Sequence, residues 1–258
     1  MMLRYLYLHK RSLPRMLEIF FWPVMELLVW GFVSVYIKSL APGALSNIIA
    51  ILLSAMIFWD ILYRSQQAVS IAIVEDIWTQ NIVNILISPL KIWEWLFSTF
   101  LYGFLKITAI TVILSLIAFG LYGFNLIDNL GLYLVPLVFN LLLFGWAMGV
   151  FTSALVVRWG HSAEALVWGI PYLLQPLSAI YYPLSVLPHW LQVVSKCLPS
   201  TYVFEGARRI AETRALPMET FWIALGLNLV YFVVGGFFFN GMYRGARNSG
   251  RLGRLGMD

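Results

Sequence analysis

The sequence predicts an all-α integral membrane protein with six transmembrane helices. The 258-residue chain is 61% hydrophobic and 11% charged, with a mean hydropathy of +0.82, whereas soluble domains are about 25% charged. Six apolar runs each approach the roughly 20 residues that a helix needs to cross a bilayer. Lysine and arginine collect between and beyond these runs, a distribution that indicates membrane orientation.

The predicted spans cover about residues 17–37, 47–68, 95–121, 132–156, 163–181 and 220–240. Basic residues cluster before the first span and after the last one: Arg4, Lys10, Arg11, Arg15, Arg244, Arg247, Arg251 and Arg254. By the positive-inside rule, both termini are predicted to face the cytoplasm. Because we find no repeat and no soluble segment, residues 1–258 are expected to form one multi-pass domain of the inner (cytoplasmic) membrane.

Residues 1–14 are too short and too charged to cross the bilayer. Leu3, Tyr7 and Leu8 stand beside a basic cluster, a combination that favours a helix lying in the membrane interface. Pro14 is expected to end this helix. The segment is therefore predicted to lie on the cytoplasmic surface.

A short amphipathic helix is predicted between the second and third spans, over residues 75–88. Its apolar residues follow helical spacing and its polar residues gather on another side: Trp78, Ile82, Ile85 and Leu86 against Gln80, Asn81, Asn84 and Ser88. Glu75 and Asp76 suit its N-terminal end, where the helix dipole favours negative charge. The polar side either contacts a soluble partner or belongs to an interfacial turn that has none.

The link over residues 182–219 precedes the last span. Prolines 183, 188 and 199 divide it, and residues 189–198 and 201–211 are each expected to form a short helix about half a membrane deep. Its basic residues are accompanied by glutamates, and the even total of six spans places it outside the cell. Irregular backbone at that depth requires cover from protein or a water-filled cavity.

Two stretches of sequence resemble a known family. The segments "WTQNIVNILISPLKIWEW" and "SAIYYPLSVLPHWLQVVSKCLPSTYVFEGARR" look like those after the second span and before the last span in the permeases of ABC-2 type ABC exporters. Their order, their spacing and the six-span layout all match that family. The resemblance therefore covers nearly the whole chain and implies one ABC-2 type transmembrane domain.

The resemblance also implies a mechanism and partners. Residues 75–88 would be the coupling helix that docks into a separate ABC ATP-binding subunit, through Glu75, Asp76, Trp78, Gln80, Asn81, Asn84 and Ser88. Two copies of the chain would form the export path by alternating access, with two ATP-binding subunits below. The short helices before the last span would cap the outer end of this path.

The chain itself lacks signs of catalysis. It has no G-x-x-x-x-G-K-[ST] loop and no Gly-Lys pair, so it cannot hold nucleotide phosphates in that way. ATP and magnesium are therefore expected in the partner ATPase, with no cofactor in this chain. Cys197 stands alone, the three histidines are spread along the sequence, and the net charge of +5 includes no basic block with interleaved aromatics. We therefore predict no metal site and no nucleic-acid partner.

Three ionisable residues fall well inside predicted spans, where such residues are costly and often functional. Glu26, Asp60 and Lys106 are expected either to pair within the bundle or to line the transport path. Asp60 can also pair with Arg64, which lies one helical turn away. An alternative function is a proton-coupled secondary transporter that uses these three residues. Against it, we find no inverted repeat in the sequence. The sequence does not select a substrate.

Overall fold

The computed structural model describes residues 13–40, 48–79, 81, 84–85, 88–215 and 217–249. Every regular element in these ranges is a helix, so the predicted all-α class is confirmed for this part of the chain. Most of the predicted interfacial helix over residues 1–14 lies outside the described residues. The first described helix, α2 (Leu13–Leu40), begins at its end.

Long helices form the bundle: α2, α3 (Ile48–Trp78), α5 (Ile92–Tyr122), α7 (Leu134–Trp159) and α11 (Met218–Asn248). They contain 26 to 31 residues, or about 39–46 Å at 1.5 Å per residue, enough to cross a bilayer. By length and composition the described chain has five candidate spans, of which one, Leu126–Leu177, is 52 residues long. The predicted count of six is therefore not confirmed. The chain is thus a multi-pass membrane protein.

The fifth predicted span, residues 163–181, is shorter than expected. Here α7 continues through η2 (Gly160–Ala163) into α8 (Glu164–Leu177), which has only 14 residues and contains two prolines. At about 21 Å, α8 is too short to cross alone. The prolines remove backbone donors from the helix, and Ala179 directly beyond it has a φ of 51°, in the left-handed region.

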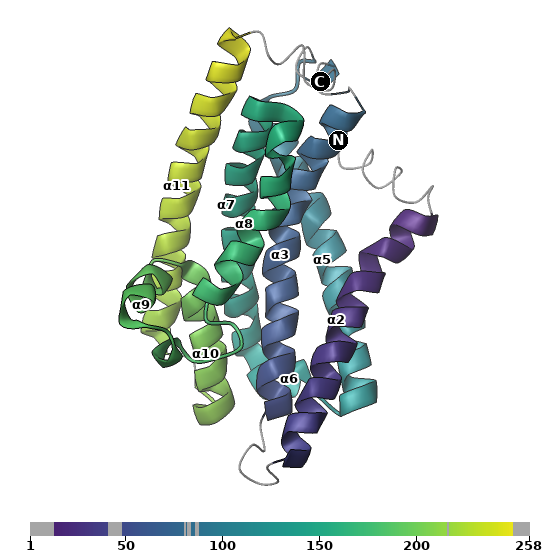
Figure 1. Ribbon diagram of the computed structural model, residues 1–258, viewed down its shortest axis with the longest axis vertical. Helices are drawn as coiled ribbons and strands as arrows, with labels where there is room; N and C mark the ends of the chain where they lie inside the picture. Colours follow the sequence, from purple (N-terminus) through teal and green to yellow (C-terminus); the bar gives the residue numbers. More distant parts are fainter. Residues whose placement is uncertain are drawn as a thin grey trace.

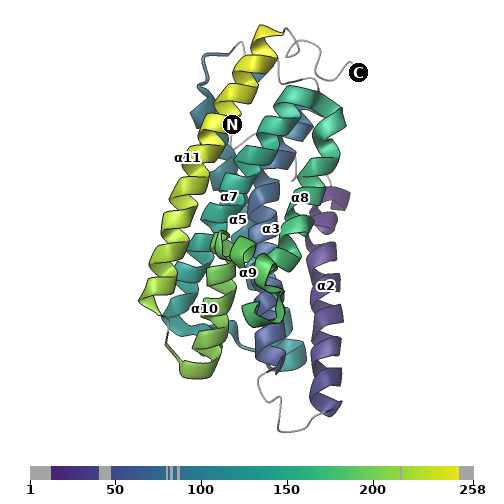
Figure 2. The same cartoon turned by 60° about the vertical axis from the view of Figure 1, so that its left-hand side comes forward.

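The bundle has two ends, which we name by residues. The Trp78 end holds the last turn of α3 and the first turn of α8, joined by a hydrogen bond from Trp78 Nε1 to Glu164 Oε2. The Tyr122 end holds α6 (Leu126–Leu130) and η1 (Gly131–Tyr133). Figures 1 and 2 show α10 (Pro199–Thr213) in the half of the bundle that also holds α6.

α3 occupies the centre of the bundle. It runs along α7 and α5, and Figure 1 shows it between α2 and α8. Glycines let α7 approach it closely: a Cβ on Gly145 would overlap Ser65 Oγ and stand 2.6 Å from the Leu62 carbonyl oxygen. A Cβ on Gly149 would stand 2.8 Å from the Gln66 carbonyl oxygen. The contact depends on the absence of side chains at both positions.

Buried polar side chains also join α3 to its neighbours. Gln66 Nε2 donates to Thr152 Oγ1 of α7 at 3.0 Å, and the hydroxyls of Ser70 and Thr152 lie 2.6 Å apart. Gln67 Nε2 donates to the Val167 carbonyl oxygen of α8 at 3.2 Å. In hydrocarbon such bonds have no competition from water. They fix α3, α7 and α8 in one register.

The link before α11 contains η3 (Leu184–Val186), α9 (His189–Lys196) and α10. Short helices therefore occur close to the predicted ranges 189–198 and 201–211. The hydroxyl of Tyr231, near the middle of α11, donates to the Cys197 carbonyl oxygen at 3.3 Å. The turn between α9 and α10 thus lies beside the middle of a spanning helix.

Candidate functional site

The first finding at the Trp78 end corrects the predicted start of the amphipathic helix. α3 continues to Trp78, so Glu75 and Asp76 lie in its last turn and not in the first turn of a separate helix. The reason is the buried stripe of α3: Ile73, Val74 and Ile77 are at most 2% exposed and belong to one apolar cluster. Burial of this stripe outweighs the unfavourable position of two acids at a helix C-terminus.

Asp76 is a second correction. Its side chain is completely buried, so it cannot contact a docked subunit directly. Its carboxylate accepts a hydrogen bond from Asn81 Nδ2 at 3.4 Å, and its backbone carbonyl accepts one from the Asn81 backbone N–H at 2.9 Å. Asp76 therefore positions the chain that leaves α3. Glu75, one residue earlier, is half-buried.

Beyond Asn81 the described residues separate into a buried and an exposed side. The Ile85 backbone N–H donates to the Asn81 carbonyl oxygen at 3.1 Å, as in one turn of helix, and the Ile85 side chain is only 8% exposed. It joins Ile77 and Trp95 in the same apolar cluster. Asn84 is exposed and donates to Asn81 Oδ1 at 3.3 Å. Ile85 anchors a turn that leaves Asn84 accessible.

The remaining predicted docking residues differ in their positions. Ser88 is half-buried, and its hydroxyl donates to the Ile85 carbonyl oxygen at 2.6 Å. Trp78 is 50% exposed, although it belongs to the apolar stripe of the predicted helix. Its indole N–H finds a polar partner in Glu164, which explains the exposure. Gln80, Ile82 and Leu86 fall outside the described residues.

The corner between α7 and α8 completes this end. Glu164 Oε2 accepts from Trp78 and lies 3.3 Å from His161 Nδ1. Arg158, near the end of α7, donates to Ser249 Oγ of the segment after α11 at 3.2 Å. Sequence reasoning missed the link between Trp78 and Glu164, because no local spacing connects residues 86 positions apart.

The ionisable residues predicted inside the spans come together halfway along the bundle. Asp60 is 4% exposed, and both of its carboxylate oxygens lie 2.8 Å from Arg64 Nε. Lys106 of α5 attracts the same carboxylate, and Glu26 of α2 lies close enough to be repelled by it. The expected pair of Asp60 with Arg64 is therefore present. Two acids and two bases from three helices share one interior region.

A second arrangement fastens the link before α11. Arg208 of α10 donates to the carbonyl oxygens of Ala179 at 2.7 Å and Ile180 at 3.0 Å, and its Nη2 also donates to Glu205 at 2.7 Å. Glu205 in turn accepts from the Leu184 backbone N–H at 2.7 Å. The glutamate and arginine of the "EGAR" stretch thus hold the irregular backbone between α8 and η3.

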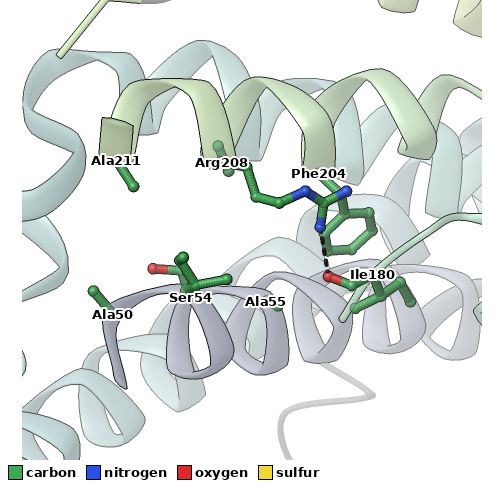
Figure 3. A pocket seen from close by; sticks show the side chains of 9 residues that line it. Ala50, Ser54, Ala55, Ile180, Phe204, Arg208 and Ala211 are labelled. Atoms are coloured by element: carbon green, nitrogen blue, oxygen red, sulfur yellow. Dashed lines mark hydrogen bonds between the residues drawn. The ribbon is translucent and has the colours of Figure 1, made fainter. Parts of the chain in front are cut away.

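Figure 3 shows Arg208 between α10 and α3, with its bond to Ile180 drawn. A small hollow of about 10 Å³ lies between the two helices there, and the side chains facing it are mostly small: Ala50, Ile51, Ser54, Ala55, Ile180, Phe204, Ala207, Arg208 and Ala211. Small side chains leave room for α10 to move closer to α3. Among the described residues, no group of His, Cys, Asp and Glu side chains is placed to hold a metal ion.

These features define a multi-pass membrane protein with a central helix that joins a polar end to a cluster of interior charges. Comparison with protein families gives its place: a model described as "ABC-2 family transporter protein" matches residues 36–242. The match covers well over half of the chain, so the protein belongs to the ABC-2 family. It is a membrane transport component and not itself an ATPase, and this family works with an ABC ATP-binding subunit. No curated protein matches the sequence significantly.

Proposed function

We propose that the chain is the permease subunit of an ATP-driven exporter. Two copies form the path by alternating access, and two ATP-binding subunits, which hold ATP and magnesium, dock at the Trp78 end. The observation that carries the proposal is the turn at Asn84 and Ile85: a buried isoleucine holds it against the bundle while a polar side chain stays exposed. Only a turn held in this way can transmit movement of a docked subunit.

The central helix provides the connection. α3 passes from the docking turn to the interior charges at Asp60 and on to the hollow beside Ser54. Because its bonds to Thr152 and the close contact at Gly145 tie it to α7, the pair moves as one body. ATP-driven movement at the Trp78 end would then open or close the hollow between α3 and α10.

Six crossings are supported by the positions of the helix ends. α8 begins at the Trp78 end, beside Trp78 itself. α10 ends at the Tyr122 end, where Arg214 Nη1 donates to the Asp128 carbonyl oxygen at 2.7 Å. The chain must therefore cross between them, and it does so in two halves, α8 and α10. With the Trp78 end cytoplasmic, both termini lie on the cytoplasmic side of the inner membrane.

The family assignment does not favour the alternative of a proton-coupled transporter. It relied on Glu26, Asp60 and Lys106, and the Asp60 carboxylate is already held by Arg64. Membership of the ABC-2 family favours ATP as the energy source. The interior charges retain roles in stability and, as argued below, in binding the transported compound.

Variants of the docking turn test the proposal. Asn84→Arg is expected to weaken binding of the ATP-binding subunit about tenfold or more, because a bulky charge replaces an exposed contact in a packed interface. The folded yield should not change, since Asn84 is exposed. The measurement is copurification of the two subunits from nanodiscs, with size-exclusion chromatography as the check on folding.

A matched control separates the loss of the docking contact from the effect of a change in net charge. Glu212→Gln raises the net charge by the same amount at an exposed position of α10 near the Tyr122 end and should leave binding unchanged. Ile85→Asp, which buries an unpaired charge, should instead reduce the folded yield. Wild-type binding by Asn84→Arg, or equal losses for Asn84→Arg and Glu212→Gln, would refute docking at this turn.

A further inference from the structure

Aromatic rings surround one side of the interior charges, where α3 lies between α2 and α8 (Figure 1). Trp30 stands one turn after Glu26 on α2 and stacks on Tyr181, with ring centroids 4.2 Å apart. On α3, Tyr63 lies 5.5 Å from Tyr172 of α8. We call Glu26 with these four rings the aromatic face. Its members come from three helices and from the segment that follows α8.

The carboxylate of the aromatic face has no close counter-ion. Glu26 makes no hydrogen bond or ion pair with any described residue, whereas Arg64 is bound to Asp60 and Lys106 also attracts Asp60. A carboxylate near the middle of a spanning helix is costly unless it is paired or serves a function. The Glu26 carboxyl group, beside the four rings, is therefore available to bind a cation from outside the chain.

The rings are open to a ligand. Tyr172 is 55% exposed, and Glu26, Trp30, Tyr63 and Tyr181 are all partly exposed. The hydroxyl of Tyr181 is buried and lies close to Gln175 of α8. Aromatic faces attract cations through the negative charge above the ring, more strongly where water is absent.

We propose that the aromatic face binds the cationic part of the transported compound, and that the substrates are organic cations with apolar or aromatic groups. This inference rests on the proposed transport function and names its substrate class. Glu26 supplies the counter-charge, Trp30 and Tyr172 supply ring surface, and the Tyr181 hydroxyl accepts or donates one hydrogen bond. An organic anion of the same shape would meet repulsion from Glu26 and is excluded.

Binding can be tested without the ATP-binding subunit. The purified permease in nanodiscs is titrated with tetraphenylphosphonium, with its isosteric anion tetraphenylborate and with a neutral disaccharide, and empty nanodiscs give the membrane background. Saturable binding is expected for the cation alone. Glu26→Gln, which keeps the shape of the side chain, should weaken it about tenfold or more, because an ion pair with ring contacts is lost.

Controls identify the contacts. Trp30→Leu should weaken binding, Trp30→Phe should largely preserve it, and Glu219→Gln, an exposed change at the start of α11, should have no effect. Equal binding of the anion, saturable binding of the disaccharide, or cation binding that survives Glu26→Gln in a folded protein would overturn the inference. If the cation does not bind but the ATP-binding subunit still docks, the binding site is refuted and the proposed function is not. If the cation binds but the ATP-binding subunit does not dock, the proposed function is refuted and the binding site is not.

Discussion

Gly145→Ala is expected to disrupt the permease although it adds a single methyl group. The new Cβ would overlap Ser65 Oγ and approach the Leu62 carbonyl oxygen to 2.6 Å. Because one of these atoms belongs to the backbone, α3 and α7 would have to separate, at a cost of about 1–3 kcal/mol. The buried bonds of Gln66 and Ser70 to Thr152 would lengthen as well. The thermal midpoint and the monodisperse yield in detergent measure the effect.

Gly226→Ala is the matched control. No atom lies within 4 Å of its added Cβ among the described residues, and alanine favours a helix over glycine by up to about 1 kcal/mol. This variant should be as stable as the wild type or slightly more stable. If both alanine variants behaved alike, close packing of α3 on α7 would not be what holds the bundle together.

Asp60→Leu is expected to have an even larger effect. It leaves Arg64, whose side chain is 14% exposed, without the carboxylate that binds it, and breaking a buried pair from one side costs about 3–5 kcal/mol. Adding Arg64→Leu should restore part of the loss, since a leucine pair contains no unpaired charge. Melting temperatures of the two single variants and the double variant give the coupling between the sites.

The double variant shows whether the pair of Asp60 and Arg64 serves the stability of the fold or the transport path. A double variant less stable than Asp60→Leu alone would show that the pair is not the relevant unit. Recovery of folding together with full transport would mark the pair as structural. Recovery of folding without transport would place the pair on the transport path, beside Glu26.

Composition and apolar run length were enough to predict the class of protein and most helix positions. The boundary at Glu75 was wrong for a physical reason. Two adjacent acids are typical of a helix start, yet Ile73 and Ile77 continue the buried stripe of α3 past them. The spacing of four residues between Ile73 and Ile77 fits that stripe. Tertiary burial outweighed a local preference.

The contacts of the candidate sites were harder to foresee. Arg208 donates to carbonyl oxygens 28 and 29 residues away in the sequence. Trp30 stacks on Tyr181, which is more than half the length of the chain away in the sequence. Periodicity shows which side of a helix is apolar, but it does not show which two helices meet. Glu26 could be recognised as unusual from its position in a span, whereas its aromatic surroundings required the packing of α2, α3 and α8.

Photo-crosslinking from Asn84 tests the central claim most directly. A photoreactive phenylalanine derivative is placed at position 84 in the membranes of living cells, and captured proteins are identified by mass spectrometry. Leu132, 90% exposed at the Tyr122 end, is the control position. We expect position 84 to capture a protein with a P-loop ATPase domain and position 132 to capture none. The account is contradicted if position 84 yields only lipid adducts, or captures the ATPase no better than position 132.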